Sequence, residues 1–266
     1  MQQNQPAKKP IIRKKKKPFP TLAVTAPLAL LILIIIFLEM YVKMSGISRT
    51  ILPAPHAMVK EFARNFVRDI WPQMLFTLKV ILTGYFIAVP AGMLIAAFCS
   101  QFKILFKMLS PIIVLIVVTP MITLVPLMML WMGFNENVRI VVVILQATPI
   151  ITLNMLTGFS KVETQKLELM RSMGASRLTT FVKLVFPNAM PQVFTGLKLG
   201  CIFSTIAAMS ADIAAGKSGL GYRISQYSGM VMTEMAYGTI LVVALIGIIL
   251  FQIVASIEKR VIVWIK

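Results

Sequence analysis

Six long apolar blocks separated by short polar segments dominate this chain. They cover about residues 21–42, 74–98, 106–132, 138–158, 189–212 and 236–257. As an α-helix rising about 1.5 Å per residue, each block is long enough to cross roughly 30 Å of hydrocarbon. The first block is too long for the core of a signal peptide and no small-residue cleavage site follows it, so we expect it to stay in place. The pattern predicts an all-α integral membrane protein with about six transmembrane helices.

The polar segment over residues 159–187 is longer than a membrane crossing requires. Its second half places apolar residues at i, i+3, i+4 and i+7, namely Leu178, Phe181, Val182 and Val185. Ser176 stands where an N-cap would accept a hydrogen bond from an unpaired backbone N–H. Gly174 lies between the halves, where a residue without a Cβ turns at the lowest steric cost. We expect a helix, a tight glycine turn and a second helix that ends at Pro187, together forming a docking element at the membrane surface.

The segment over residues 43–72 is not a plain loop. Apolar side chains recur there at helical spacing, at Val59, Phe62, Phe66 and Ile70. Charged residues occupy the other faces of the same stretch. This pattern predicts an amphipathic helix that lies in the outer interface of the membrane.

The third apolar block carries three prolines, Pro111, Pro120 and Pro126. A proline inside a helix removes a hydrogen bond and clashes with the preceding turn, so this span must be broken or kinked. The carbonyls freed in this way need protein or water partners inside a membrane. Broken helices of this kind are more often found lining a cavity than facing lipid, which makes this block a candidate wall of a pathway.

Charge sets the expected orientation. Hydrophobic residues make up 58% of the chain and charged residues only 14%, with mean hydropathy +0.85. The net charge of +18 therefore indicates basic loops rather than a nucleic-acid partner. Segments 1–20, 99–107, 159–187 and 258–266 hold 17 of the 27 Lys and Arg residues. We expect both termini and the 159–187 segment on the cytoplasmic side, with the basic tail over residues 1–20 available to anionic lipid.

The sequence contains few residues that could form a catalytic or metal-binding site. Its two cysteines, Cys99 and Cys201, are far apart, and His56 is its one histidine. No catalytic triad or metal site can be assembled from these residues, so we expect no enzyme activity, no cofactor and no metal ion in this chain. Residues 211–218 fit a relaxed phosphate-loop pattern, but an apolar helix rather than a strand precedes them.

Within the 159–187 segment, Glu168-Leu169-Met170 is followed after three residues by Gly174 and then by Leu184-x-Phe186-Pro187. This spacing resembles the EAA motif of permease subunits of binding-protein-dependent ABC importers, with Leu169 and Met170 in place of two alanines. In that family the motif forms coupling helices that dock into a groove on the cytoplasmic ATPase. The resemblance assigns ATPase coupling to Glu168, Arg171, Gly174, Ala175, Ser176 and Pro187.

The likeness covers roughly residues 50–260. Further stretches in the same order resemble the nitrate/sulfonate/taurine branch of the family, among them Leu52 to Pro55, Thr77 to Val80, Thr119 to Gly133 and Asp212 to Tyr222. The resemblance implies a type I ABC importer permease fold, multi-pass in the cell membrane. It also implies three partners: a cytoplasmic ABC ATPase dimer that hydrolyses the ATP, a second permease copy or paralogue, and an extracytoplasmic solute-binding protein.

The implied organisation is a basic tail over 1–20, a first transmembrane helix over 21–42, an external segment over 43–72, a five-helix permease core over 73–260 and a cytoplasmic tail over 261–266. Candidate pathway residues are Lys79, Pro120, Thr123, Pro126, Lys198 and Asp212. Gly196 and Gly200 form a small-residue face for helix packing. The two lysines either reach an interface or face the aqueous path and favour anions.

The substrate stays open between an anion of the sulfonate, taurine or nitrate kind and a neutral heterocycle. A rival function is a secondary transporter or channel that works without an ATPase, which would show ionisable pairs or inverted repeats within its spans. A second rival is a membrane protein without transport activity that carries the same docking loop.

Overall fold

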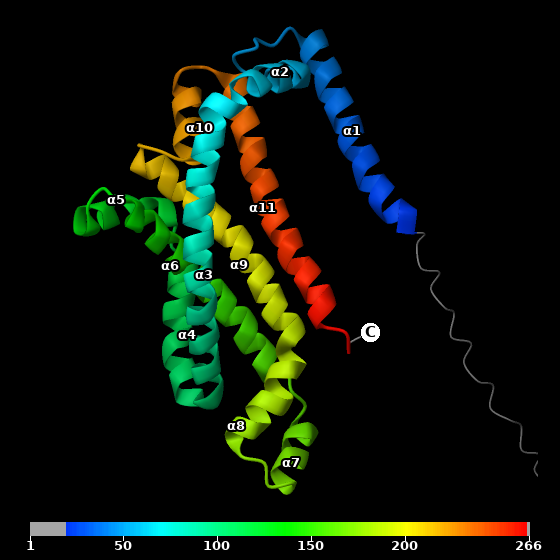
Figure 1. The fold of residues 1–266 in the computed structure, drawn as a ribbon, viewed down its shortest axis with the longest axis vertical. Coiled ribbons are helices and arrows are strands. Elements are labelled where there is room, and N and C mark those ends of the chain that lie inside the picture. Colours follow the sequence, from blue (N-terminus) through cyan, green and yellow to red (C-terminus); the bar gives the residue numbers. More distant parts are fainter. Residues whose placement is uncertain (1–19, 265–266) are drawn as a thin grey trace, which may run out of the picture.

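The computed structural model describes residues 20–264, and these form helices joined by short turns (Figure 1). The helices are α1 (Pro20–Ser45), α2 (Pro55–Asn65), the π-helix η1 (Phe66–Ile70), α3 (Trp71–Gln101), α4 (Lys103–Val118), α5 (Met121–Met132), α6 (Glu136–Ser160), α7 (Thr164–Ser172), α8 (Arg177–Thr180), the π-helix η2 (Phe181–Val185), α9 (Phe186–Ala215), α10 (Leu220–Gly229) and α11 (Thr233–Val261). No strand occurs in residues 20–264, so the all-α prediction is confirmed. Residues 1–19 of the tail expected over 1–20, and residues 265–266, lie outside the described part.

The expectation of about six membrane spans is confirmed. Five helices of the described chain are long and apolar enough to cross a membrane, and the pair α4–α5 makes a sixth if counted as one bent span. Apart from α1, the helices cluster into one bundle with two distinct ends, which we call the α7–α8 end and the α2–α10 end (Figure 1).

The third apolar block is broken, as its prolines predict. Helices α4 and α5 meet at 99° across Thr119 and Pro120. Thr119 has extended backbone (φ −67°, ψ 124°), because the residue before a proline is forced out of the helical region. Its hydroxyl donates to the carbonyl of Leu115 at 2.7 Å, and its backbone N–H donates to the same carbonyl at 3.0 Å. The break therefore falls at Pro120, while Pro111 and Pro126 lie inside helices.

The centre of the bundle consists of α3, α6 and α9, which cross at small residues. A Cβ added at Gly196 would lie 3.0 Å from Asn154 Cβ, and one added at Gly200 would lie 2.9 Å from Ile151 Cδ1. Small residues allow helix backbones in a membrane to approach closely and gain van der Waals contact. Gly196 and Gly200 thus face α6 of the same chain.

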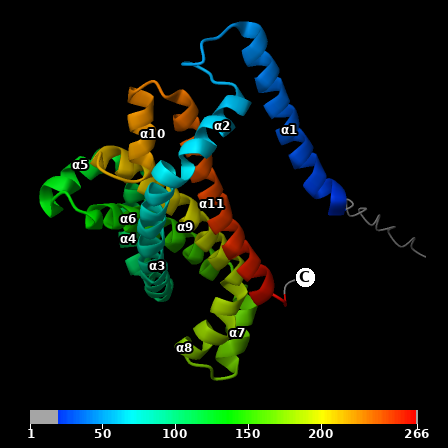
Figure 2. The same ribbon diagram turned by 45° about the horizontal axis from the view of Figure 1, so that its top comes forward.

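Helix α1 stands apart from the rest of the bundle in both views (Figures 1 and 2). Only 6% of its apolar window is buried, and Leu30 and Phe37 are 60% and 66% exposed. Near its end, Glu39 accepts a hydrogen bond from His56 Nδ1 at 2.7 Å, which ties α1 to α2. The long apolar surface of α1 therefore remains available to lipid or to another subunit.

Helix α2 lies across the end of the bundle, above α3 and α11 (Figure 1). Phe62 packs against Gly238 of α11, and a Cβ at Gly238 would collide with the Phe62 ring. Phe66 and Ile70 continue this buried face through η1. Val59, expected on the same face, is instead 67% exposed. The packed face of this segment therefore begins at Phe62.

Candidate functional site

We call the unit over residues 163–180, which contains α7, α8 and their connection, the α7–α8 turn. Two backbone hydrogen bonds close α7 at this connection. The N–H of Gly174 donates to the carbonyl of Arg171 at 2.9 Å, and the N–H of Ala175 donates to the carbonyl of Met170 at 3.0 Å. This pair of bonds is the Schellman arrangement, which places the intervening residue in the left-handed region. Gly174 has φ +71°, a conformation that a Cβ makes costly.

The next helix starts at Ser176, as the sequence indicates. Its side-chain oxygen accepts a hydrogen bond from Thr179 N–H at 3.2 Å. The expectation that this second helix ends at Pro187 is wrong. Helical structure runs without interruption from Arg177 to Ala215. The N–H of Phe186 bonds to the carbonyl of Phe181 in π register, and this wide turn accommodates Pro187, which has no N–H to donate.

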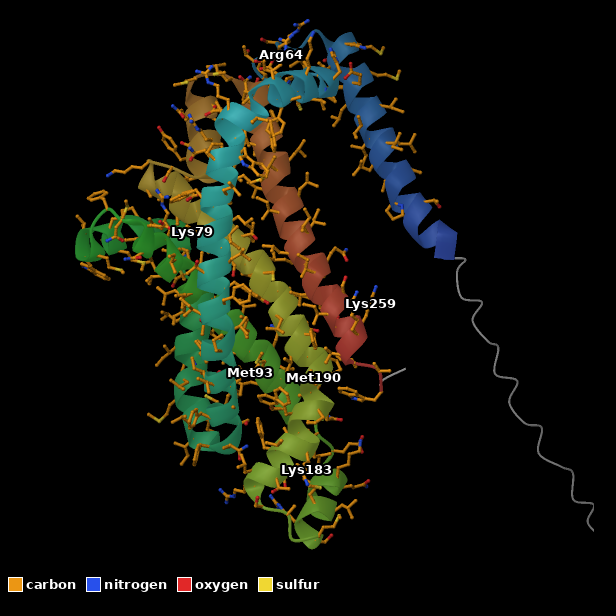
Figure 3. All side chains as sticks on the ribbon, viewed as in Figure 1. Arg64, Lys79, Met93, Lys183, Met190 and Lys259 are labelled. Carbon is orange, nitrogen blue, oxygen red and sulfur yellow. The ribbon has the colours of Figure 1, made fainter. Side chains whose placement is uncertain are left out.

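This continuous helix of 39 residues is about 58 Å long at about 1.5 Å per residue, nearly twice the hydrocarbon thickness of a membrane. Its first turns therefore extend beyond the bundle, where Lys183 lies (Figure 3). Three aromatic rings join it to the end of α6. Phe159 lies 5.2 Å from Phe181 and 6.5 Å from Phe186, centroid to centroid. Displacement of the α7–α8 turn would therefore be passed to both α9 and α6 through packed side chains.

The α7–α8 turn presents apolar side chains to solvent. Leu169, Met173 and Leu178 are 61%, 73% and 73% exposed. Glu168 and Arg171 are exposed on α7 beside them. Exposed apolar residues rimmed by polar ones mark surfaces that contact another protein or a membrane.

A buried charge cluster lies at the α2–α10 end of the bundle. We define it as Thr77 of α3, Arg139 of α6, Asp212 of α9 and Ser218 of the following loop. Asp212 is fully buried, and its Oδ2 accepts a hydrogen bond from the Thr77 hydroxyl at 2.7 Å. Arg139 Nη1 lies 3.7 Å from Asp212 Oδ1 and donates to Ser218 Oγ at 2.8 Å. The pairing compensates two charges that would otherwise be costly to bury.

The same cluster holds the loop between α9 and α10. The N–H of Leu220 donates to Thr77 Oγ1 at 2.9 Å, and the N–H of Gly219 donates to Gln73 Oε1 at 2.6 Å. Gly219 has φ +96°, and a Cβ there would collide with the carboxylate of Asp212. The loop is thereby fixed to α3, so α3, α6, α9 and α10 meet at one polar centre.

Asp212 was expected from the sequence as a pathway residue, but its partner Arg139 was missed. Arg139 lies in the first turn of α6 and is only 4% exposed, although no role was assigned to it from the sequence. Its flanking residues offered a signal, because Val138, Val142 and Val143 make this part of the chain an apolar face. A charge on such a face needs an opposite charge within the bundle, and Asp212 is the candidate.

The two candidate pathway lysines are paired with carboxylates. Lys79 Nζ lies 2.9 Å from Glu136 of α6, and Lys198 Nζ lies 2.7 Å from Glu258 of α11. Lys79 lies on the part of α3 that is nearer the α2–α10 end (Figure 3). Each pair is close to neutral, so neither position supplies an unpaired positive charge for an anion. Both pairs join neighbouring helices, but only the Lys198–Glu258 pair is largely buried, since the Lys79 side chain is 65% exposed.

The candidate residues on the broken span lie together around the bend. Pro120 precedes α5, and Thr123 donates its hydroxyl to the Pro120 carbonyl at 2.7 Å. Both of these residues and Pro126 are exposed. A hollow of about 920 Å³ opens beside the bend, lined by α4 residues and Pro120. Among the described residues, no group of three or more His, Cys, Asp or Glu side chains could hold a metal ion.

The described chain is a bundle of apolar helices with one broken span and a projecting helix–turn–helix at one end, the architecture of a multi-pass membrane protein. The chain belongs to the family of inner membrane components of binding-protein-dependent transport systems, whose model matches residues 88–263. It is therefore a multi-pass protein of the inner membrane and a permease of the ABC importer kind.

Its relatives are transport permeases. The chain is 25% identical over 224 residues to the taurine transport system permease TauC of Escherichia coli, covering 82% of each chain. It is 25% identical over 235 residues to the riboflavin transport permease RibX of Chloroflexus aurantiacus, covering 88% of each. It is 24% identical over 244 residues to the formylaminopyrimidine transport permease ThiX of Halalkalibacterium halodurans, covering 90% of this chain and 96% of that one.

Solved structures share the fold. A chain of the MetNI methionine ABC transporter in an inward-facing conformation matches with TM-score 0.54 and 22% identity, covering 74% of this chain and 97% of that one. A chain of an amino acid ABC transporter matches with TM-score 0.57 and 16% identity, covering 76% and 94%. The expectation of an ABC importer permease fold is confirmed.

Proposed function

We propose that this chain forms half of the translocation pathway of an ATP-driven importer. It transmits the conformational change of a separate ATPase to the membrane helices. The single observation that carries the proposal is the uninterrupted helix from Arg177 to Ala215. One end of that helix follows the exposed α7–α8 turn, and the other carries the buried Asp212. A rigid element that reaches both ends of the bundle suits a subunit that must change access from one side to the other.

The orientation we propose places both termini and the α7–α8 turn in the cytoplasm, on the strength of the Lys and Arg distribution. A cytoplasmic ABC ATPase dimer would then contact Leu169 and Met173 around Gly174. A second copy of the chain, or a paralogue, would complete the pathway beside the bend at Pro120. A solute-binding protein would deliver the solute at the α2–α10 end.

The mechanism we propose is alternating access. Closure of the ATPase dimer displaces the α7–α8 turn, and the aromatic contacts of Phe159, Phe181 and Phe186 carry this displacement into α6 and α9. The coupling can be only as large as the difference in free energy of the turn–ATPase contact between the two states. ATP hydrolysis belongs to the other polypeptide, and this chain supplies no catalytic group.

The substrate we favour is a small sulfonate- or taurine-like anion, which the taurine and aliphatic sulfonate permeases among the relatives support. A neutral heterocycle is the alternative, supported by the riboflavin and formylaminopyrimidine permeases. The pairing of Lys79 and Lys198 with carboxylates is compatible with this alternative, because neither lysine offers an unpaired charge.

The test is reconstitution of the purified permease in proteoliposomes with its co-purifying ATPase and the solute-binding protein encoded beside it. We expect solute-dependent stimulation of ATP hydrolysis and ATP-dependent uptake of the solute bound by that protein. Uptake that persists without ATPase, or permease that recruits no ATPase, would contradict the proposal. Competition between taurine and riboflavin for uptake would decide between the anionic and the heterocyclic substrate.

A further inference from the structure

A cleft of about 540 Å³ lies at the α7–α8 end of the bundle, between the α7–α8 turn and the ends of α3 and α6. Its lining includes Ser100 and Gln101 at the end of α3, together with Arg171 of α7 and Arg177 of α8. Phe159 of α6 also lines the cleft. The cleft therefore combines two cationic side chains with hydrogen-bonding groups at a helix end.

An apolar cavity of about 350 Å³ adjoins this cleft. The two spaces share Gln101, Arg177 and Phe181 in their walls. Phe98, Phe102 and Leu178 supply the apolar lining of the second space, and all three are more than half exposed. A cationic cleft continuous with an apolar groove fits a ligand that has a charged head and a hydrocarbon tail.

No acidic group of the turn neutralises the two arginines. Within residues 20–264, no ion pair and no side-chain hydrogen bond to protein involves either guanidinium. Glu163 of the turn pairs with Lys166 at 2.9 Å, and neither Glu163 nor Glu168 lines the two spaces. Two unpaired cations facing one cleft favour an anionic ligand, and a phosphate diester offers acceptor oxygens to both guanidinium groups.

The position along α3 indicates where such a ligand would come from. Phe98 and Phe102 mark the end of the apolar span of α3, which finishes at Gln101. The groove between these rings and Leu178 opens outward, since each side chain is exposed. It therefore lies at the boundary between hydrocarbon and headgroups, within reach of a lipid of the surrounding bilayer.

We infer that these two spaces bind one anionic phospholipid, with its phosphate between Arg171 and Arg177 and an acyl chain along Phe98, Phe102 and Leu178. The inference rests on the proposed function in taking the α7–α8 end as the cytoplasmic face of the membrane. The lipid fills the space between the end of α3 and the turn. It thereby holds the turn against the bundle in the position from which displacement is passed to α9.

The test uses the purified full-length permease alone, in a neutral detergent, titrated with phosphatidylglycerol and followed by native mass spectrometry. Phosphatidylcholine is the comparison lipid, and inorganic phosphate at the same concentration tests whether a free anion suffices. The variants are the pair R171Q and R177Q, the charge-conserving pair R171K and R177K, and the control K183Q. Lys183 is an exposed cation of the same segment that lines neither space.

We expect one tightly retained phosphatidylglycerol and no comparable phosphatidylcholine. Cations near a membrane surface each favour anionic lipid about fivefold, so the double glutamine variant is expected to bind about 30-fold more weakly. The double lysine variant and K183Q should retain binding. An unchanged thermal midpoint of the glutamine variant would establish that it is folded, which its two exposed positions favour.

Equal retention of the two lipids would overturn the inference, as would unchanged binding in the double glutamine variant. Displacement of the lipid by inorganic phosphate at equal concentration would overturn the role of the apolar groove. No ATPase is present in this experiment, so its outcome does not depend on whether the turn docks an ATPase. Failure of the permease to recruit an ATPase would contradict the proposed function and leave the lipid result standing.

Discussion

Replacing Gly174 should reduce the solute imported per ATP hydrolysed while the protein still inserts and folds. Gly174 adopts φ +71° at the centre of the α7–α8 turn, where its N–H closes α7. Nothing lies within 4 Å of a Cβ built at this position, so a side chain meets no steric obstacle within the described residues. The cost of substitution is therefore one of backbone conformation alone.

That cost can be stated in magnitude. An L-residue in the left-handed region loses roughly 1–2 kcal/mol relative to glycine, which changes the ratio of closed to open turn by roughly 5- to 30-fold. Asparagine tolerates this region better than alanine, and β-branched valine tolerates it least. We therefore expect uptake per ATP to fall in the order Gly174, G174N, G174A, G174V.

The assay measures ATP hydrolysis and solute uptake in parallel in proteoliposomes that contain equal amounts of permease. Gly46 provides a matched control, because it has φ +64° and equally open surroundings but lies in the connection between α1 and α2. G46V should leave the ratio of uptake to hydrolysis unchanged. Wild-type ratios in G174V, or an equal loss in G46V, would refute the assignment of coupling to this turn.

Three further outcomes follow from the packing and the ion pairs. Replacing Asp212 by alanine leaves its buried arginine partner unpaired and should cost about 3–5 kcal/mol of stability. The measurement is the thermal midpoint in detergent, which should fall. An unchanged midpoint would contradict the paired geometry. G196L overpacks the α6–α9 crossing and should cost about 1–3 kcal/mol, whereas G247A, whose Cβ would meet nothing nearer than 3.8 Å, should be neutral in the same assay. Exchanging the charges of Lys198 and Glu258 together should restore the uptake that K198E alone loses; continued loss in a folded double variant would mean that the cation itself is needed at position 198.

The membrane spans and the break in the third of them were predictable from the sequence, because they depend on the length of each apolar block and on the position of proline. The six apolar blocks correspond to the observed spans, and the observed break in the third span falls at Pro120. Gly174 and Ser176 were predictable because turn and cap chemistry is local. The conformation of these two residues is determined by their immediate neighbours in the chain.

What could not be predicted depends on partners distant in sequence or on small changes of helical register. The π segment before Pro187 allows α9 to continue, and no local rule distinguishes it from a helix end. The burial of Arg139 depends on Asp212, which lies 73 residues later in the chain. Lys79 and Lys198 were open to either interpretation until their carboxylate partners were seen in space.

The central claim is that the α7–α8 turn contacts the ATPase, and cysteine cross-linking tests it most directly. Met173 is 73% exposed at the tip of the turn, and the native Cys99 and Cys201 are buried, so M173C adds one accessible thiol among the described residues. V231C, on the exposed loop between α10 and α11, is the control. We predict that M173C cross-links to the ATPase subunit and that the cross-linked complex loses uptake, while V231C does neither. A cross-link from V231C instead, or full uptake by the M173C-linked complex, would contradict the account.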